Sequence, residues 1–270
     1  MTYGADDGGQ ALRDLDVTIP HSARIWNYWL GGKDNFAADR EAGEEFLGVY
    51  PQQRAKARAC RYFLARAVRY LVVEQGVRQF LDVGTGLPTA DNTHEVAQRY
   101  APESRIVYVD NDPLVLAHAR ILLTSSPEGA THYIDADLHD PDRILAEAAG
   151  ILDLDRPVAL LLIGVLGHVA DHAEARSIVQ RLLSGLPSGS FLVQCDGADT
   201  DEAYVAALEQ YRDSGGVPYN VRSLEQITAF YDGLELVEPG VVPIPQWRPE
   251  PSRFAGPADV SELGGVGRKA

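Results

Sequence analysis

One short stretch, residues 80–112, constrains the fold of this chain more than any other. An apolar run at residues 79–83 predicts a strand, and the sequence Gly-Thr-Gly at residues 84–86 follows it directly. Residues 92–100 are compatible with a helix, and residues 105–109 predict a second strand that ends in acidic residues. A strand, a glycine turn, a helix and a second strand with a terminal acid are typical of one half of a nucleotide-binding α/β unit.

The alternation of strands and helices continues through the rest of the chain. The runs VALLLI and FLVQ are apolar without alternation, as expected for parallel strands that are buried on both faces. We expect strands at residues 79–83, 105–109, 131–134, 158–163, 190–194 and 234–237. We expect helices between them at residues 92–100, 113–123, 140–149, 173–183 and 202–211. A short strand in the tail GGVGRKA would pair at the edge of the sheet, so the pattern predicts an α/β fold with a mostly parallel sheet.

Helical material precedes the first strand. Ser22 is expected to cap a first helix that Gly31 and Gly32 end, and two more helices are expected at residues 36–48 and 51–75. Most of the arginines on the third helix are interpreted as a solvated face. Helices placed before the first strand suit a cap over the edge of the sheet. We therefore divide the chain into a flexible N-terminus at 1–18, a helical cap at 19–76 and an α/β domain at 77–270.

The charge balance argues against a nucleic-acid partner. The 270 residues include 24 Lys and Arg against 39 Asp and Glu, a net charge of −15, whereas nucleic-acid affinity depends on clustered Lys and Arg. A small-molecule, peptide or protein substrate is favoured instead, and a small molecule is the leading expectation. No apolar run approaches the ~18 residues of a membrane span and no signal peptide is recognisable, so we expect a cytoplasmic protein without a membrane partner. Cys60 and Cys195 fit no metal-ligand spacing, and no metal is expected.

The glycine turn and the acids around it are the first candidates for chemistry. Gly84 and Gly86 suit a turn in which the backbone approaches a ligand closely. Asp110 ends the strand after the one that carries Asp82, so its carboxylate could accept hydrogen bonds from both ribose hydroxyls of an adenosine. The third glycine of a dinucleotide-binding turn is absent, because Leu-Pro-Thr follows at residues 87–89. This departure weakens the prediction of a pyrophosphate site.

Acidic residues also follow the next predicted strand. Asp137 could accept the exocyclic amine of adenine while Leu138 packs on the ring. The alternative is that Asp135 and Asp137 only cap the helix that begins near Pro141. Acids at three successive strand ends suit a cofactor with an adenine, a ribose and a cationic centre, and Asp82 could hold an ammonium group.

These motifs resemble those of class I S-adenosylmethionine-dependent methyltransferases. Longer blocks resemble one actinobacterial family of S-adenosyl methyltransferases, formerly classed as a domain of unknown function. They read HSARIWNYWLGGKDNFAADR, FLDVGTGLPTADNTHEVAQ, VYVDNDPLVLAHAR and DGLELVEPGVVPIPQWRP. The resemblance implies S-adenosylmethionine as cofactor and a Rossmann-like, seven-stranded, mostly parallel sheet with helices on both faces and an N-terminal helical cap.

The resemblance also implies a set of cofactor-binding residues at the ends of the first three strands. The methionine part would lie against the glycine turn, the ribose at the second strand and the adenine at the third. The residues are Asp82, Gly84, Thr85, Gly86, Asp110, Asn111, Asp137 and Leu138.

The substrate side is less defined by the resemblance. The block GGKDN would form part of a lid together with preceding residues; the candidates are Arg24, Tyr28, Lys33 and Asn35. Lys33 is either a ligand for a carboxylate or a surface lysine. Gly167 takes the position at which the family carries a histidine, and His168 follows it.

Methyl transfer needs mainly the alignment of nucleophile, methyl carbon and sulfur. His168 and His94 are the candidates for a general base, and the alternative for each is a packing or loop role. The leading function is methyl transfer from S-adenosylmethionine to a small-molecule acceptor. The alternatives are a non-catalytic S-adenosylmethionine-binding regulator and a nicotinamide-dependent oxidoreductase, against which the missing glycine argues.

Overall fold

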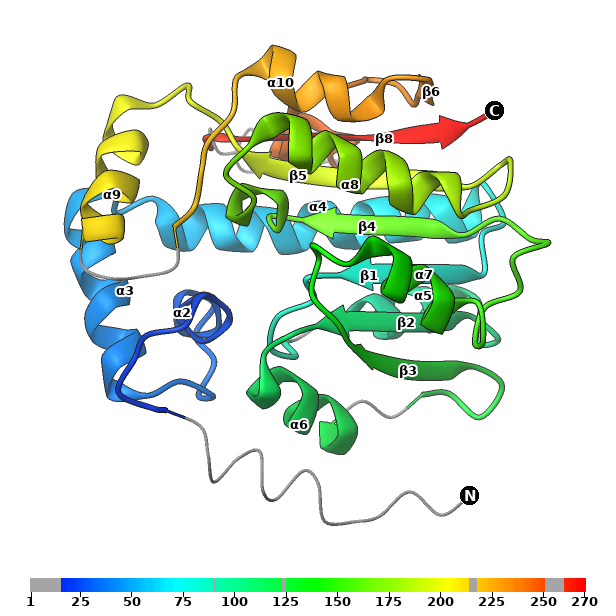
Figure 1. Ribbon diagram of the computed structural model, residues 1–270, viewed down its shortest axis with the longest axis horizontal. Helices are drawn as coiled ribbons and strands as arrows, with labels where there is room; N and C mark the ends of the chain where they lie inside the picture. Colours follow the sequence, from blue (N-terminus) through cyan, green and yellow to red (C-terminus); the bar gives the residue numbers. More distant parts are fainter. Residues whose placement is uncertain (1–15, 90, 123–124, 214–217, 251–259) are drawn as a thin grey trace.

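The computed structural model describes residues 16–89, 91–122, 125–213, 218–250 and 260–270 (Figure 1). Most of the segment predicted to be flexible, 1–18, therefore lies outside the described residues.

A single sheet forms the centre of the molecule. Its parallel strands are β1 (Gln79–Val83), β2 (Arg105–Asp110), β3 (Ala130–Asp135), β4 (Ala159–Ile163) and β5 (Phe191–Gly197). Antiparallel strands complete it: β6 (Leu234–Leu236), β7 (Val242–Pro243) and β8 (Glu262–Lys269). The order is β3-β2-β1-β4-β5-β8-β6, with the short β7 also paired to β8. The predicted mostly parallel α/β sheet is confirmed.

One strand lies elsewhere than predicted. β8, expected at the edge of the sheet, is inserted between β5 and β6. All seven residues of β5 pair with it, from Phe191 opposite Arg268 to Gly197 opposite Glu262. Residues 264, 265 and 267 of β8 are glycines, and a Cβ at residue 264 would lie 2.5 Å from the Cβ of Cys195. The glycines therefore allow β8 to pack closely between two partners.

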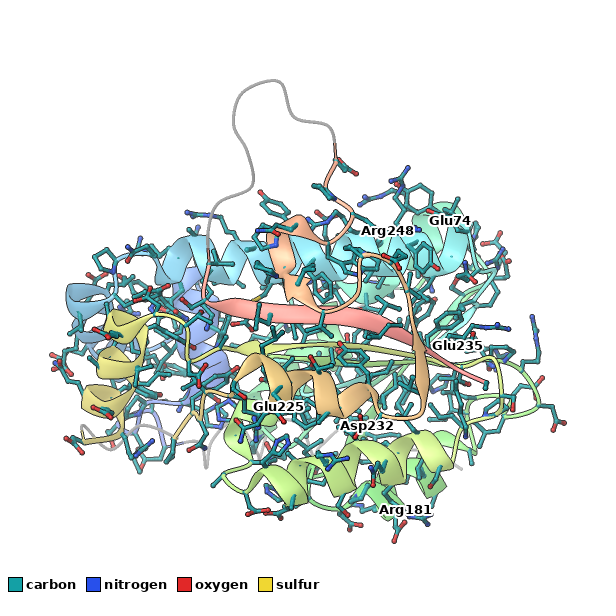
Figure 2. All side chains as sticks on the ribbon, turned by 90° about the horizontal axis from the view of Figure 1, so that it is seen from above. Glu74, Arg181, Glu225, Asp232, Glu235 and Arg248 are labelled. Carbon is teal, nitrogen blue, oxygen red and sulfur yellow. The ribbon has the colours of Figure 1, made fainter. Side chains whose placement is uncertain are left out.

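The apolar strands are buried because helices cover both faces of the sheet. Phe80 of β1 belongs to one apolar cluster and its neighbour Leu81 to the other, as expected when successive side chains point to opposite faces. Helices α4 (Gln53–Val73) and α5 (Thr93–Tyr100) pack on the first face. Helices α7 (Pro141–Ala148) and α8 (His172–Ser184) pack on the second. Figure 2 shows α4 and α8 on opposite sides of β8.

A group of helices lies beyond the carboxyl ends of the parallel strands. Figure 1 shows α2 (Ser22–Trp29), α3 (Ala37–Val49) and α9 (Glu202–Asp213) together at this end. They share an aromatic-rich core that includes Trp29, Phe46 and Tyr204. The long α4 joins this core to the sheet, since Ala57 packs in the cap and Phe63 packs against the strands. The division of the chain at residues 76 and 77 stays a prediction.

The start of α2 differs from the prediction. Ser22 is its first residue rather than its cap; His21 holds the N-cap position, and its carbonyl accepts the amides of Arg24 and Ile25. The other α-helices in the part of the chain that the structure describes are α6 (Pro113–Leu122) and α10 (Leu224–Thr228). None of the described helices combines the length and the apolar character of a membrane span.

Candidate functional site

A cavity of about 380 Å³ lies between the carboxyl ends of the strands and α2. Parallel strands present their carboxyl ends at one edge, which is why residues far apart in sequence meet there. Every residue predicted to hold a cofactor lines this cavity. They are Asp82, Gly84, Thr85, Gly86, Asp110, Asn111, Asp137 and Leu138.

The glycine turn forms the floor of the cavity. Gly84 has φ +74° and Gly86 has φ +66°, a left-handed conformation that favours glycine. A Cβ on Gly84 would lie 2.2 Å from Cγ2 of Val165, which follows β4. The absence of a side chain therefore allows the turns after β1 and β4 to approach each other beneath the ligand space.

Asp110, the last residue of β2, is oriented by the glycine turn. Its Oδ2 accepts the amide of Gly86 at 2.8 Å, and its Oδ1 accepts the amide of Asp112 at 3.0 Å. Burial raises the pKa of Asp110 despite these bonds. Each carboxylate oxygen can accept a second hydrogen bond, so the group can still receive a vicinal diol.

An acid and an arginine meet at the β1 end of the cavity. Asp82 is 6% exposed, accepts the hydroxyl of Thr93 at 2.6 Å, and burial raises its pKa to about 6. Arg61 of α4 lines the same cavity and donates to the carbonyl of Asp91 at 2.8 Å. Burial lowers the pKa of Arg61, while the charge of Asp82 acts in the opposite direction. A carboxylate beside a guanidinium suits the ammonium and carboxylate of an amino-acid group.

Arg61 was not predicted as a site residue. The sequence pattern assigns most arginines of α4 to a solvated face and gives no signal that separates Arg61 from them, because its position in the cavity depends on how α4 packs against the sheet.

The β3 end of the cavity combines an acid with an apolar surface. Asp137 accepts the amide of His139 at 2.8 Å and the side-chain amide of Asn111 at 3.0 Å. Burial acts to raise the pKa of Asp137, but these hydrogen bonds outweigh it and lower the pKa. Asp137 does not cap α7, because Asp140 accepts the amide of Arg143 in that role. The capping alternative is therefore wrong, and Asp137 stays available to a ligand beside Leu138.

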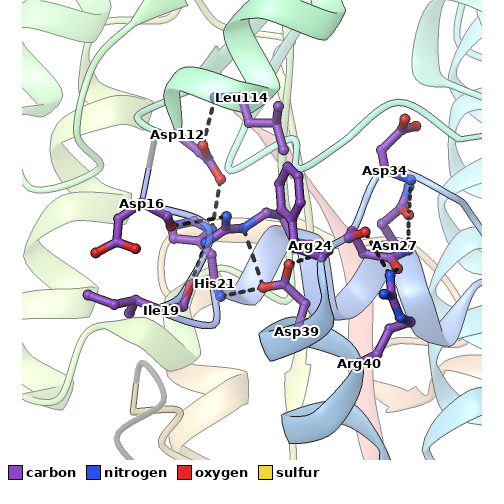
Figure 3. A network of polar contacts seen from close by, with 12 residues as sticks. Asp16, Ile19, His21, Arg24, Asn27, Asp34, Asp39, Arg40, Asp112 and Leu114 are labelled. Carbon is purple, nitrogen blue, oxygen red and sulfur yellow. Dashed lines mark hydrogen bonds and ion pairs between the residues drawn. The ribbon is translucent and has the colours of Figure 1, made fainter. Parts of the chain in front are cut away.

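One face of α2 forms a wall of the cavity. Its lining residues repeat at helical spacing: Ser22, Ala23, Trp26, Asn27 and Leu30. Asn27 is 2% exposed, and its Oδ1 accepts the backbone amide of Asp34 at 3.0 Å and the side-chain amide of Asn35 at 2.9 Å (Figure 3). The loop after α2 is thereby tied to the helix that covers the site.

The predicted lid residues lie in the lid, but none lines the cavity. Arg24 is buried on the other side of α2, 3.4 Å from Asp39, where it donates to the carbonyl of Ile19 (Figure 3). The hydroxyl of Tyr28 bonds to Glu44. Lys33 is exposed, and the side-chain amide of Asn35 donates to the side-chain oxygen of Asn27. Arg24 and Tyr28 differ from the cavity-lining residues of α2 only in their phase on the helix, whereas Lys33 and Asn35 lie in the loop that follows it.

The lid is anchored to the sheet through His21. Its Nδ1 lies 2.8 Å from Oδ2 of Asp112, whose Oδ1 accepts the amide of Leu114 at the start of α6 (Figure 3). Asp112 is almost fully buried, and His21 itself lines the cavity. The contact therefore links the entry to α2 with the turn that follows β2.

The two candidate histidines are in different places. His168 lines the cavity in a short turn after β4 (Leu166–His168), with its Nδ1 3.2 Å from the carbonyl of Pro218. A carbonyl only accepts, so Nδ1 carries the proton and Nε2 is the acceptor in the neutral ring. Burial lowers the pKa of His168. His94 is not brought to the cavity; it is buried in α5, with its Nδ1 2.9 Å from the hydroxyl of Tyr108.

A smaller cavity of about 30 Å³ adjoins the first. The two share Ser22, Trp26 and His168 as wall residues. The small cavity reaches into the aromatic core of the cap, between α2, α3 and α9.

The fold, the strand order and the row of acids together define a Rossmann-like protein with a site for an adenosine-containing cofactor that carries an amino-acid end.

Comparison with known proteins identifies the family. The chain belongs to the S-adenosyl methyltransferase family, whose sequence model matches residues 8–270. It is therefore a methyltransferase with S-adenosylmethionine as cofactor, as predicted, and not a nicotinamide-dependent oxidoreductase.

Solved structures agree with this assignment. A DUF574 family protein from Streptomyces avermitilis is 44% identical, with a TM-score of 0.89 over 94% of this chain and 99% of that one. A Thermobifida fusca protein assigned as a methyltransferase is 35% identical, with a TM-score of 0.86 over 98% and 99% of the two chains. An O-methyltransferase family protein from Burkholderia thailandensis shares the fold at 14% identity, with a TM-score of 0.53 over 97% and 67%. No curated protein matches the chain.

Proposed function

We propose that this enzyme methylates a small-molecule acceptor in the cavity beneath α2, with His168 as general base. The observation that supports this best is the position of His168 after β4, where the cofactor cavity meets the smaller aromatic cavity. The acceptor class, the general base and the residue roles below belong to this proposal.

The residues present fit the cofactor along the row of strands. Asp137 and Leu138 suit the adenine, Asp110 suits the ribose diol, and Asp82 with Arg61 suits the amino-acid end. S-adenosylmethionine supplies an activated methyl group on a sulfonium. The chain must therefore mainly hold the reacting atoms in line and exclude water.

A small acceptor is favoured because α2 covers part of the site. Trp26 and Asn27 of α2 cover the strand ends, and the bonds from Asp34 and Asn35 hold Asn27 in place. The cavity volume lies near the lower end of the range for small-molecule sites, and the cofactor must share that space. A macromolecular segment would require α2 to leave this position.

His168 is suited to accept a proton from the acceptor. The carbonyl of Pro218 sets the tautomer that leaves Nε2 unprotonated, and the lowered pKa keeps the ring neutral near pH 7. A general base contributes about 10²–10⁴-fold to a rate when the nucleophile carries a proton. Activity should therefore fall on the acidic side, as His168 becomes protonated.

The acceptor class can be tested with a tritiated methyl donor. The enzyme is incubated with the labelled cofactor and a bacterial extract separated into low-mass and high-mass fractions. Transfer of the label to the low-mass fraction is expected. Labelling confined to protein or nucleic acid would overturn the small-molecule proposal.

The base is tested on the acceptor recovered from that fraction. His168→Gln should lower kcat about 10²–10⁴-fold and remove the acidic limb of the pH profile, while cofactor affinity stays unchanged. His132→Gln, at an exposed position of β3, is the matched control. A His168 variant with the same kcat and pH profile as the wild type would remove His168 from the mechanism.

A further inference from the structure

The small cavity beside His168 has a composition that restricts what can enter it. Its volume of about 30 Å³ has room for one or two waters or for a small substituent, but not for a whole ring. Aromatic side chains dominate its walls: Trp26, Trp29, Phe46, Tyr204, Tyr211 and Tyr219. A ligand that reaches from the cofactor cavity therefore passes between flat apolar surfaces.

Several polar atoms of these aromatic walls are bonded elsewhere. Trp29 donates its ring N–H to the carbonyl of Gly43 at 3.2 Å. The hydroxyl of Tyr219 donates to Asp196 at 2.8 Å, and the hydroxyl of Tyr204 bonds to Lys56. These rings offer faces and edges to the cavity rather than hydrogen-bonding groups. At the junction of the two cavities, which Trp26 shares, they suit the flat, apolar body of a ligand whose substituent enters the small cavity.

One polar atom of the cavity wall lacks a partner. Gln53, the first residue of α4, is 2% exposed, and its Oε1 has no hydrogen-bond partner among the residues that the structure describes. A buried carbonyl without a donor is costly. Gln53 therefore contributes a buried, unpaired acceptor to the wall of the cavity, and an O–H or N–H of a ligand would satisfy it.

The charge near the cavity disfavours a cationic ligand. The Nζ of Lys56 lies 3.7 Å from the centre of the Tyr204 ring and 5.7 Å from that of Tyr219. A buried ammonium already occupies the position over Tyr204 that a ligand cation would need. Glu262 neutralises this ammonium at 2.8 Å, so a ligand anion has no free charge to pair with.

His168 connects this cavity with the cofactor site. Along the edge β3-β2-β1-β4, the proposed order is adenine at β3, ribose at β2 and the amino-acid part at β1, with the sulfonium between the last two. The turn that carries His168 follows β4, the next strand in this order. A molecule that contacts His168 and Gln53 together therefore spans the junction of the two cavities.

We infer that the methyl acceptor is a neutral, planar ring compound with two donor groups, a hydroxyl placed at His168 and an O–H or N–H donated to Gln53. The inference rests on the proposed methylation of a small acceptor at His168 and adds its chemical class. Gln53 acts as a specificity-determining residue. It selects compounds with the second donor because compounds without that donor leave its carbonyl buried and unpaired.

Matched pairs of phenols test the inference. Calorimetry on enzyme saturated with S-adenosylhomocysteine compares 2,7-dihydroxynaphthalene with 2-naphthol, and resorcinol with phenol, with tyramine as a cationic probe. At least one dihydroxy compound should bind about tenfold more tightly than its monohydroxy partner. Tyramine should bind no better than phenol. Gln53→Leu should abolish the preference without lowering the unfolding temperature, while Gln75→Leu, at an exposed position, should retain it.

Each outcome has a distinct meaning. Failure of S-adenosylmethionine and S-adenosylhomocysteine to bind the wild type would overturn the proposed function itself. If the cofactor binds normally, three results would overturn the acceptor class alone. These are equal binding of the paired phenols, tightest binding of tyramine and no binding of any probe. A preference that persists in Gln53→Leu would remove Gln53 from the recognition of the acceptor.

Discussion

Asp110 connects the turn after β1 with the site proposed for the ribose. Its carboxylate accepts the amides of Gly86 and Asp112 while it faces the cavity. Asp110→Ala should weaken S-adenosylmethionine binding by about 1.5–3 kcal/mol, because hydrogen bonds to a charged group are lost. Isothermal calorimetry measures the change. Asp135→Asn, an exposed acid at the end of β3, is the control, and equal affinity of the wild type and Asp110→Ala would exclude Asp110 from the cofactor site.

Asp82 makes the stability of the cofactor-free enzyme depend on pH. Its pKa of about 6 in the folded chain exceeds the ordinary 3.8, so between these values the folded state binds more protons than the unfolded state. The contribution of Asp82 to stability therefore decreases as the pH rises from about 4 to about 6. Asp82→Asn should stabilise the cofactor-free protein at pH 7 by about 1–3 kcal/mol, as measured by urea denaturation.

The same substitution should weaken cofactor binding. The ammonium of the cofactor favours ionised Asp82, so wild-type affinity should decline below pH 6. The affinity of Asp82→Asn should be lower at pH 7 and nearly constant from pH 5 to pH 8. A wild-type affinity that is flat through pH 6 would contradict this role.

The strand-end acids were predictable from the sequence, whereas the lid contacts were not. Asp82, Asp110 and Asp137 lie near the ends of apolar runs, and the carboxyl ends of parallel strands meet at one edge of the sheet. The helix at 22–29 is aromatic on more than one face, so its hydrophobic pattern does not define its orientation. Trp26 and Asn27 face the cavity, although the resemblance had favoured their neighbours.

At the scale of elements, the approach of the β1 and β4 turns depends on Gly84. Gly86→Ala should cost about 1–2 kcal/mol from its left-handed backbone alone, because nothing lies within 4 Å of its Cβ position. Gly84→Ala carries the same strain and also overlaps Val165, which should add about 1–3 kcal/mol. Urea denaturation measures both. Val165→Ala should recover part of the added loss, and equal losses for the two glycines would contradict the packing argument.

The sequence predicted most elements because each has a local signal. The β1 bounds and the helix near residue 93 follow from the apolar run and from a capping pair, Asn92 with Glu95. The interior position of β8 had no such signal. Its glycine-rich sequence is typical of an irregular terminal segment. Only its pairing with β5 shows why these positions are glycines, since a Cβ atom would be too close to neighbouring atoms.

At the scale of the whole molecule, a buried ion pair joins the start of α4 to β8. Lys56 and Glu262 are 1% and 0% exposed and lie 2.8 Å apart. Burial acts against the charged lysine, but the Glu262 carboxylate outweighs it and raises the pKa of Lys56. Glu262→Gln should destabilise the protein by about 3–5 kcal/mol, because it leaves a buried charge without its partner.

Denaturation of paired variants checks this expectation. Adding Lys56→Met to Glu262→Gln should restore much of the lost stability, since no buried charge remains. Glu147→Gln, which breaks the exposed pair with Arg143, should cost less than about 1 kcal/mol. A loss for Glu262→Gln no larger than that of Glu147→Gln would show that the buried pair is not needed.

The position of β8 between β5 and β6 also constrains the order in which the chain folds. Strands β1 to β5 pair among themselves, whereas β6 precedes β8 along the chain and joins the sheet only through it. A folding intermediate that contains the parallel strands would therefore present β5 as an open, apolar edge until the long segment from β5 to β8 has folded and β8 has paired. Such an edge invites pairing with other chains, so refolding yield should fall with protein concentration.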